Sequence, residues 1–245
     1  MSKRLTLCFS LLLCCTLLCT ACVHNTPDGS APPNDHSVDA SDTDDDSTSI
    51  PEVYQTIIQA VTDAFPWNEN DLDVIPEYPE LSFLYFHHTE LSDIGYAILD
   101  IDQNGQDELI IGDITYGTIY DIFTMKEGKA IHLLSGGEHV YYTLYQNGNF
   151  TCEWSNSAAN SGYDFLTLKN GTLTLVERVC MDALHAYETG LISDLSEATG
   201  DNCWYTSTSD NTDDYKWLSY DDADAIIQSY QEHLPISITF TPLGE

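Results

Sequence analysis

The chain has 245 residues, of which 40 are Asp or Glu and only 7 are Lys or Arg, so its formal net charge is −33. So acidic a surface repels nucleic acid and anionic lipid, which excludes nucleic acid as a partner. The length suffices for one large domain or two small ones.

Residues 1–21 predict a secretory signal peptide. Lys3 and Arg4 form a basic start, and LTLCFSLLLCCTLLCTA (5–21) is apolar and uncharged. The alternative is a membrane-anchor helix, but this run is shorter than the roughly 20 residues that span a bilayer. The sequence therefore favours export with removal of the signal peptide.

The end of this segment resembles a bacterial lipobox, LCTAC (18–22), in which a cysteine after a small residue becomes the lipidated N-terminus. Ala21 fits the position before the cleavage site, although Cys19 stands where leucine is usual. The resemblance implies that Cys22 carries acyl chains and anchors the protein to the outer face of the cell membrane. Several acyl chains hold a protein to a bilayer far better than one.

Residues 22–50 are rich in Ser, Thr, Asp and Pro and contain almost no large apolar side chains. Such a segment cannot bury enough surface to offset the entropy of ordering, so it predicts a disordered acidic tether. A partly ordered N-terminal strand is the alternative. The tether would separate the membrane from a domain that comprises residues 51–245.

The domain begins with apolar residues at helical spacing, which predict a helix over 51–65 and a shorter one over 81–93. From residue 94 the pattern changes to short β-branched and aromatic segments separated by glycine-containing turns. Asn147-Gly148 and Asn170-Gly171 are strong hairpin signals. These features predict an antiparallel meander over about 95–180. Its expected strands are YAILD, ELIIG, TIYDIFTM, AIHLLS, VYYTLYQ, NFTCEW, YDFLTL and TLTLVERV.

The last third of the chain predicts a helix or loop after residue 181, a strand near CWYTST, a closing helix over 218–235 and a final strand over 236–243. Ser219 and Asp222 resemble a capping box at the start of the closing helix. The predicted fold class is α+β, with an N-terminal helical part, a central antiparallel β-meander, a C-terminal helix and a final strand.

Three cysteines remain beyond the signal segment, Cys152, Cys180 and Cys203. Three thiols cannot all pair with one another. One disulfide with one buried thiol, or three buried thiols, are both compatible with an exported protein. No Cys-x-x-Cys spacing indicates a zinc site.

The most specific motif is DIDQNGQDELIIG (100–112), in which oxygen donors alternate and a glycine permits a sharp turn. Calcium binds six to eight oxygens, and alternating donors can converge on one point. The sequence therefore predicts calcium as a cofactor. The expected ligands are Asp100, Asp102, Asn104, the carbonyl of Gln106, and Glu108.

The loop is EF-hand-like without being an EF-hand, because the twelfth position is Ile111 and not a bidentate glutamate. Its flanks also read as strands. It resembles the D-x-D-x-[DN]-G-x-x-[DE] calcium loops between β-strands of integrin-type propeller blades, with Glu108 in place of the more usual aspartate. An acidic hairpin without an ion is the alternative.

The segment IGYAILDIDQNGQDELIIGD (94–113), together with DDADAIIQSY and ITFTPL near the end, resembles a group of uncharacterised lipoproteins and secreted proteins of Gram-positive gut bacteria. The similarity covers roughly residues 80–245, and only the loop is a specific motif. It implies an exported α+β domain and brings no activity with it.

Three functions are compatible with the sequence, the third being that of a purely structural envelope protein. The first is a non-catalytic surface domain with one structural calcium ion that binds an extracellular ligand or protein partner. The second is a cell-envelope hydrolase whose site is assembled from scattered residues, because no Gly-x-Ser-x-Gly, His-Glu-x-x-His or phosphate-loop motif occurs. No catalytic residue can be assigned from the sequence.

Overall fold

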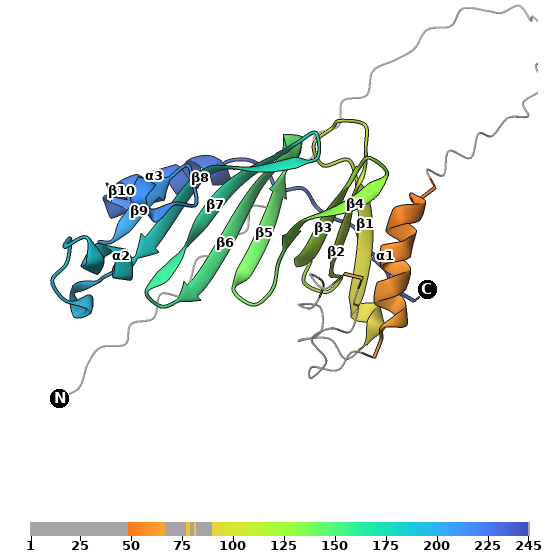
Figure 1. Cartoon of the computed structure of the whole chain (residues 1–245), viewed down its shortest axis with the longest axis horizontal. Helices are drawn as coiled ribbons and strands as arrows, with labels where there is room; N and C mark the ends of the chain where they lie inside the picture. Colours follow the sequence, from red (N-terminus) through yellow and green to blue (C-terminus); the bar gives the residue numbers. More distant parts are fainter. Residues whose placement is uncertain (1–48, 67–76, 79–80, 82–89, 245) are drawn as a thin grey trace, which may run out of the picture. The chain divides into compact units, whose positions relative to one another are not determined.

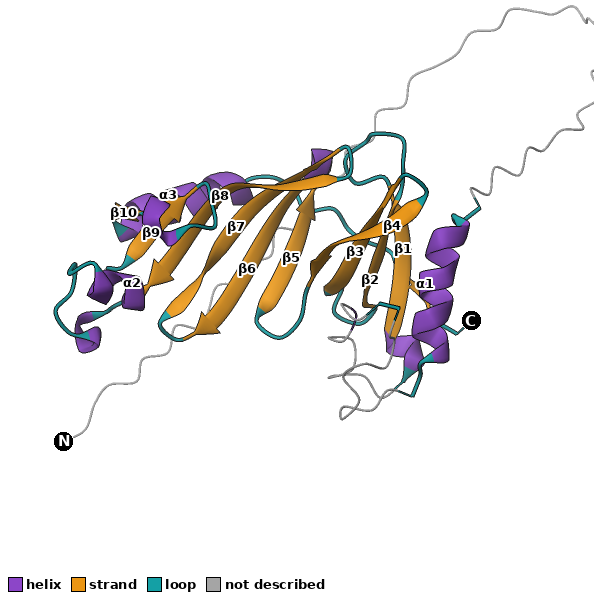
Figure 2. Cartoon of the chain, in the orientation of Figure 1, coloured by secondary structure: helices purple, strands orange, loops and turns teal. Residues whose placement is uncertain are grey.

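The computed structural model describes residues 49–66, 77–78, 81 and 90–244. The predicted signal peptide, Cys22 and nearly all of the predicted tether lie outside these residues, as does most of the helix predicted over 81–93. The described residues belong to one compact unit that is mostly β, with two antiparallel sheets and three α-helices (Figures 1 and 2). Among them, no helix is long and apolar enough to cross a bilayer.

The first sheet, called sheet A, has the strand order β11-β1-β2-β3-β4. Four of its strands follow one another in the sequence, and the fifth comes from the C-terminal end of the chain. The strands are β1 (Ile94–Leu99), β2 (Glu108–Asp113), β3 (Ile119–Lys126), β4 (Lys129–Ser135) and β11 (Thr241–Pro242).

The second sheet, called sheet B, has the strand order β10-β9-β8-β7-β6-β5 and follows the sequence throughout. Asn170 and Gly171, with φ of 50° and 67°, form the turn between β7 and β8 that the Asn-Gly signal predicts. The strands are β5 (Val140–Tyr145), β6 (Asn149–Ser157), β7 (Asn160–Lys169), β8 (Thr172–Asp182), β9 (Trp204–Ser207) and β10 (Lys216–Leu218).

The prediction of one central meander is corrected here, because the chain leaves sheet A after β4 and starts sheet B at β5. The amide of Gly136 donates to the carbonyl of Tyr120, so the backbone lies close to β3 at this point. A Cβ on Gly136 would lie 2.3 Å from the Ile119 carbonyl oxygen, which only glycine avoids. His139, with φ of 65°, then turns the chain into β5.

Helix α1 (Glu52–Asp63) corresponds to the helix predicted over 51–65. It packs against sheet A (Figure 1) through one apolar face that includes Tyr54, Ile57 and Val61, all fully buried. Burial of this amphipathic face, more than helix propensity, stabilises so short a helix. The described end of the helix predicted over 81–93 is a 3-10 turn at Leu91–Asp93.

Helix α3 (Tyr220–Gln231) lies on sheet B and corresponds to the predicted closing helix. The Ser219 hydroxyl accepts the Asp222 amide at 3.1 Å, as the capping motif predicts. The hydroxyl also donates to the Asp222 carboxylate at 2.6 Å. Its Tyr230 ring stacks on Phe165 with centroids 3.7 Å apart. The short helix α2 (Ala183–Glu188) follows β8 directly.

The two sheets share one apolar cluster, which joins Ile110 and Ile122 of sheet A to Leu144, Phe150 and Leu168 of sheet B. The predicted final strand over 236–243 is shorter than expected, since only Thr241–Pro242 pairs, with β1. The segment before it packs Ile236, Ile238 and Phe240 against the shared cluster and so crosses from one sheet to the other. The three cysteines of the domain are free and buried.

Candidate functional site: an acidic loop at the junction of the sheets

The predicted calcium loop connects β1 to β2 and folds around its own carboxylates. Asp100 accepts the amide of Asn104 at 3.0 Å and that of Gly105 at 2.8 Å. The side-chain oxygen of Asn104 accepts the amide of Gln106 at 2.7 Å. Gly105 has φ of 86°, a conformation that the glycine supplies without strain. These hydrogen bonds therefore form a tight turn without the help of a bound ion.

Three of the predicted ligands converge in this turn. Asp100, Asp102 and Glu108 each place a carboxylate oxygen within 4.8 Å of the others. Each oxygen keeps lone pairs beyond those used by the hydrogen bonds, because an ionised carboxylate has about four acceptor positions. The cluster could therefore hold a metal ion.

Glu108 differs from the two aspartates because its side chain is fully buried. Its Oε2 accepts the amide of Ile101 and its Oε1 accepts the hydroxyl of Thr124, both at 2.9 Å. Burial and, to a smaller extent, the charges of Asp102 and Asp100 together raise the pKa of Glu108 from 4.5 to about 7, although its two hydrogen bonds act to lower it. The fold thus holds a carboxyl group where its ionised form is unfavourable unless a cation balances it.

The loop also connects parts of the domain that are distant in the sequence. Asp102 Oδ2 accepts the amide of Gly171 in the β7–β8 turn at 3.3 Å, which ties sheet A to sheet B. The Tyr54 hydroxyl of α1 donates to the carbonyl of Asp107 at 2.9 Å. The side-chain amide of Gln106 donates to the carbonyl of Met125 in β3. A change in the conformation of this loop would therefore affect both sheets and α1.

The spacing of the motif predicts that Asp100, Asp102 and Glu108 converge, and their carboxylates do lie close together. Asn104 and Gln106 lie in the same turn, where their described contacts are with the loop itself and with β3. Sequence reasoning missed Thr124 and Gly171, which come from other strands. The Asn170-Gly171 turn signal could have indicated Gly171, whereas nothing in the sequence singles out Thr124.

One cluster bears on the hydrolase alternative. Asp121 of β3 lies beside His132 and Ser135 of β4, and Ser135 Oγ donates to Asp121 Oδ1 at 2.8 Å. The same carboxylate oxygen lies 2.9 Å from His132 Nε2, and Ser135 Oγ lies 3.2 Å from that nitrogen. In a serine-hydrolase relay the acid and the serine contact opposite nitrogens of the imidazole. Here both contact Nε2, so this cluster lacks the relay geometry.

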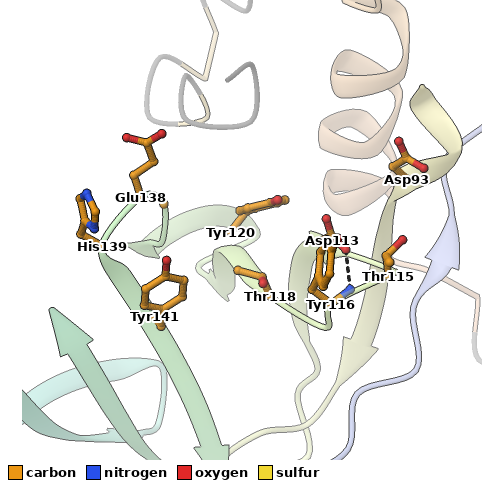
Figure 3. Close-up of a pocket in the computed structure, with 10 residues that line it drawn as sticks. Asp93, Asp113, Thr115, Tyr116, Thr118, Tyr120, Glu138, His139 and Tyr141 are labelled. Atoms are coloured by element: carbon orange, nitrogen blue, oxygen red, sulfur yellow. Dashed lines mark hydrogen bonds between the residues drawn. The ribbon is translucent and has the colours of Figure 1, made fainter. Parts of the chain in front are cut away.

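A cavity of about 720 Å³ lies at the opposite end of β1 and β2, where the chain passes from β4 to β5. Its described lining combines carboxylates, tyrosines and threonines (Figure 3). Asp113 and Tyr120 are buried, whereas Tyr116 and Tyr141 are exposed at its rim. The lining residues are Asp93, Asp113, Thr115, Tyr116, Thr118, Tyr120, Gly137, Glu138, His139 and Tyr141.

No protein-family model matches the chain, and no curated protein or solved structure is significantly similar to it. The function must therefore be inferred from the acidic loop and the cavity themselves.

Proposed function

We propose that the chain is a lipid-anchored protein of the outer face of the cell membrane, with a non-catalytic domain that binds an extracellular ligand and is stabilised by one calcium ion. The observation that carries the calcium proposal is the buried carboxylate of Glu108 beside Asp100 and Asp102. Three carboxylates this close repel one another, and a bound cation removes that repulsion.

Calcium fits this loop better than other common ions. The candidate ligands are all oxygen atoms, which excludes metals that prefer thiolate or imidazole. Magnesium requires a tighter octahedron and retains its waters, whereas calcium accepts six to eight oxygens in flexible geometry. The Asn104 side chain and the Gln106 carbonyl would complete the set. Extracellular sites bind calcium at about 10⁻⁴–10⁻³ M, which suits a protein outside the cell.

The ion would act as a structural clamp. Because Asp102 also accepts the Gly171 amide, calcium at the loop would fix the contact between sheets A and B. An ion that binds only the folded state stabilises it by about 2.7 kcal/mol at a hundredfold excess over Kd. For a domain of this size, that corresponds to a rise in Tm of roughly 5–10 °C.

The test is the Tm of the purified chain in millimolar calcium and in chelator. We expect a higher Tm in calcium and little effect of magnesium. Asp102→Asn should abolish most of the difference, while Asp107→Asn should retain it, because Asp107 lies outside the carboxylate cluster. The two variants lose the same charge in the same loop. A wild-type Tm indifferent to calcium would reduce the loop to an acidic turn.

The anchor is tested separately. The lipobox-like end of the signal segment motivates acylation of Cys22, as in the lipoproteins that the loop segment resembles. Cells that express the chain should incorporate a clickable fatty acid into the wild type and not into Cys22→Ser. Equal labelling of both would show that this cysteine is not the acylated residue.

A further inference from the structure

Sheet B carries a hollow of about 310 Å³ on the face on which helix α3 lies. Its size is at the lower end of the range for small-ligand sites. Tyr141 of β5, Glu153 of β6 and Tyr163 of β7 are direct register partners, so their side chains stand in one row on this face. The described lining residues are His139, Tyr141, Glu153, Trp154, Ser155, Ser161, Gly162, Tyr163 and Trp204.

Two aromatic rings of this hollow are held in fixed orientations. The ring of Tyr163 lies parallel to that of Phe165, with planes 8° apart and centroids separated by 6.5 Å. The indole nitrogen of Trp204 donates to the Gly200 carbonyl at 2.9 Å, which fixes the second ring. A ligand would therefore meet side chains whose conformational freedom has already been lost on folding, which reduces the entropic cost of binding.

Polar side chains lie between and beside the rings. Glu153 is exposed and stands between Tyr141 and Tyr163 in their row. In the next row of the same face, Ser155 of β6 lies opposite Ser161 of β7. Burial and the charge of Glu153 raise the pKa of Tyr163, so its hydroxyl stays protonated as a donor. The hollow thus offers hydrogen-bond donors and acceptors around aromatic rings.

This combination selects among classes of ligand. An anion is disfavoured, because the chain has a charge of −33 and Glu153 faces the hollow. One carboxylate among the described lining residues is too little to make a cation site. A purely apolar ligand would remove the polar side chains from water without replacing their hydrogen bonds. A neutral pyranose satisfies both kinds of group, because its C–H face packs on the negative face of an aromatic ring and its hydroxyls reach the polar groups around it.

The spacing of the rings indicates more than one sugar ring. Tyr141 and Tyr163 lie on strands two positions apart, and each step between strands is about 4.8 Å. Trp204 of β9 lies two strands beyond Tyr163, in the row of Ser161. An extended chain of equatorially linked pyranoses can contact all three aromatic residues, whereas a single sugar cannot.

We propose that this hollow binds a neutral, extended oligosaccharide of equatorially linked pyranose rings. The sugar rings stack on Tyr141, Tyr163 and Trp204, and their hydroxyls bond to Glu153 and the two serines. Cleavage of a glycosidic bond uses a pair of carboxyl groups, and Glu153 is the one carboxylate among the described lining residues. The inference is therefore one of binding; it rests on the proposed function and names its class of ligand.

The test is calorimetric titration of the full chain with cellotriose and with chitotriose, in millimolar calcium and a detergent without a sugar headgroup. We expect saturable binding of at least one, and the preferred sugar distinguishes a glucose chain from an N-acetylglucosamine chain. Tyr141→Ala should weaken binding about tenfold, as for other aromatic anchors. Tyr187→Ala removes the same side chain from α2, where it is 49% exposed against 51% for Tyr141, and should leave the affinity unchanged. Both variants should keep the wild-type Tm, because neither side chain is buried.

Binding of neither sugar would overturn the proposal, as would equal weakening by Tyr141→Ala and Tyr187→Ala. Maltotriose, whose axial linkage curves the chain, should bind less tightly, and an affinity equal to that of cellotriose would also overturn it. The calcium-dependent Tm is read from the same samples. Absence of sugar binding with an intact calcium effect would refute this inference alone, whereas a Tm indifferent to calcium would refute the calcium proposal.

Discussion

Strand β2 has a buried carboxylate at each end, and the two carboxylates have different surroundings. Glu108 at its start is fully buried and accepts hydrogen bonds from Ile101 and Thr124 inside a loop that contacts sheet B. Asp113 at its end is almost as buried, yet it lies in the wall of a cavity. The comparison teaches that burial of an acid does not define its role. The two residues differ in their surroundings: other parts of the chain enclose the Glu108 side chain, whereas Asp113 borders a cavity.

Two glycines allow the packing at the two ends of the molecule's sheet junction to be compared. Both have positive φ, and they lie in turns at opposite ends of the junction between sheets A and B. A Cβ on Gly148, next to the acidic loop, would lie 2.4 Å from the Leu168 carbonyl oxygen and 3.0 Å from Asp102 Cβ. We therefore expect Gly148→Ala to lower the free energy of unfolding by about 3 kcal/mol, from overlap and from the left-handed backbone. Urea denaturation measures this.

Gly117, in the turn beside the cavity, is the control for that experiment. Its φ is 69°, close to the 74° of Gly148, but a Cβ there would meet nothing within 4 Å. Gly117→Ala should therefore cost only the backbone term of about 1 kcal/mol. Equal losses for the two variants would mean that the loop end is no more tightly packed than the cavity end.

A smaller effect is expected from pH in the absence of calcium. Because the pKa of Glu108 is about 7 in the folded chain against an ordinary 4.5, the folded state binds this proton more tightly than the unfolded state. The resulting destabilisation is absent below about pH 4.5, grows as pH rises and is complete above about pH 7. The Tm in chelator should therefore rise as pH falls from 8 to 5.5.

Glu108→Gln isolates this contribution from the general repulsion in an acidic chain. The variant retains a side chain of the same size but cannot ionise, so its Tm in chelator should depend less steeply on pH. Identical slopes for wild type and variant would assign the pH dependence to other carboxylates. In that case the burial of the ionised Glu108 would have no measurable energetic cost, and such a cost would not distinguish Glu108 from Asp113.

Local sequence patterns predict the individual elements well, because their causes lie within a few residues. The Asn170-Gly171 turn, the Ser219–Asp222 cap and the β-branched and aromatic segments from β1 to β8 each follow from neighbouring side chains. The division into two sheets does not. It depends on the close approach of Gly136 to β3, which no periodicity encodes.

The same limit applies to the candidate sites. The spacing of Asp100, Asp102 and Glu108 within one loop was sufficient to predict their convergence. The hydroxyl of Thr124 and the amide of Gly171 reach the loop only through tertiary packing. The cavity was not predicted at all, because its described lining comes from three separate segments, at residue 93, over 113–120 and over 137–141, which meet only in the folded chain.

The pairing of β1 with β11 has a consequence for the order of assembly. β1 is the first strand of the described chain, yet its outer neighbour comes from near the opposite end of the sequence, with Gly95 opposite Pro242. Until that segment is available, β1 presents unpaired backbone groups, and an exposed strand edge invites pairing with other chains. Pairings so distant in sequence also form slowly. Completion of sheet A is thus postponed until residues 241 and 242 have been synthesised.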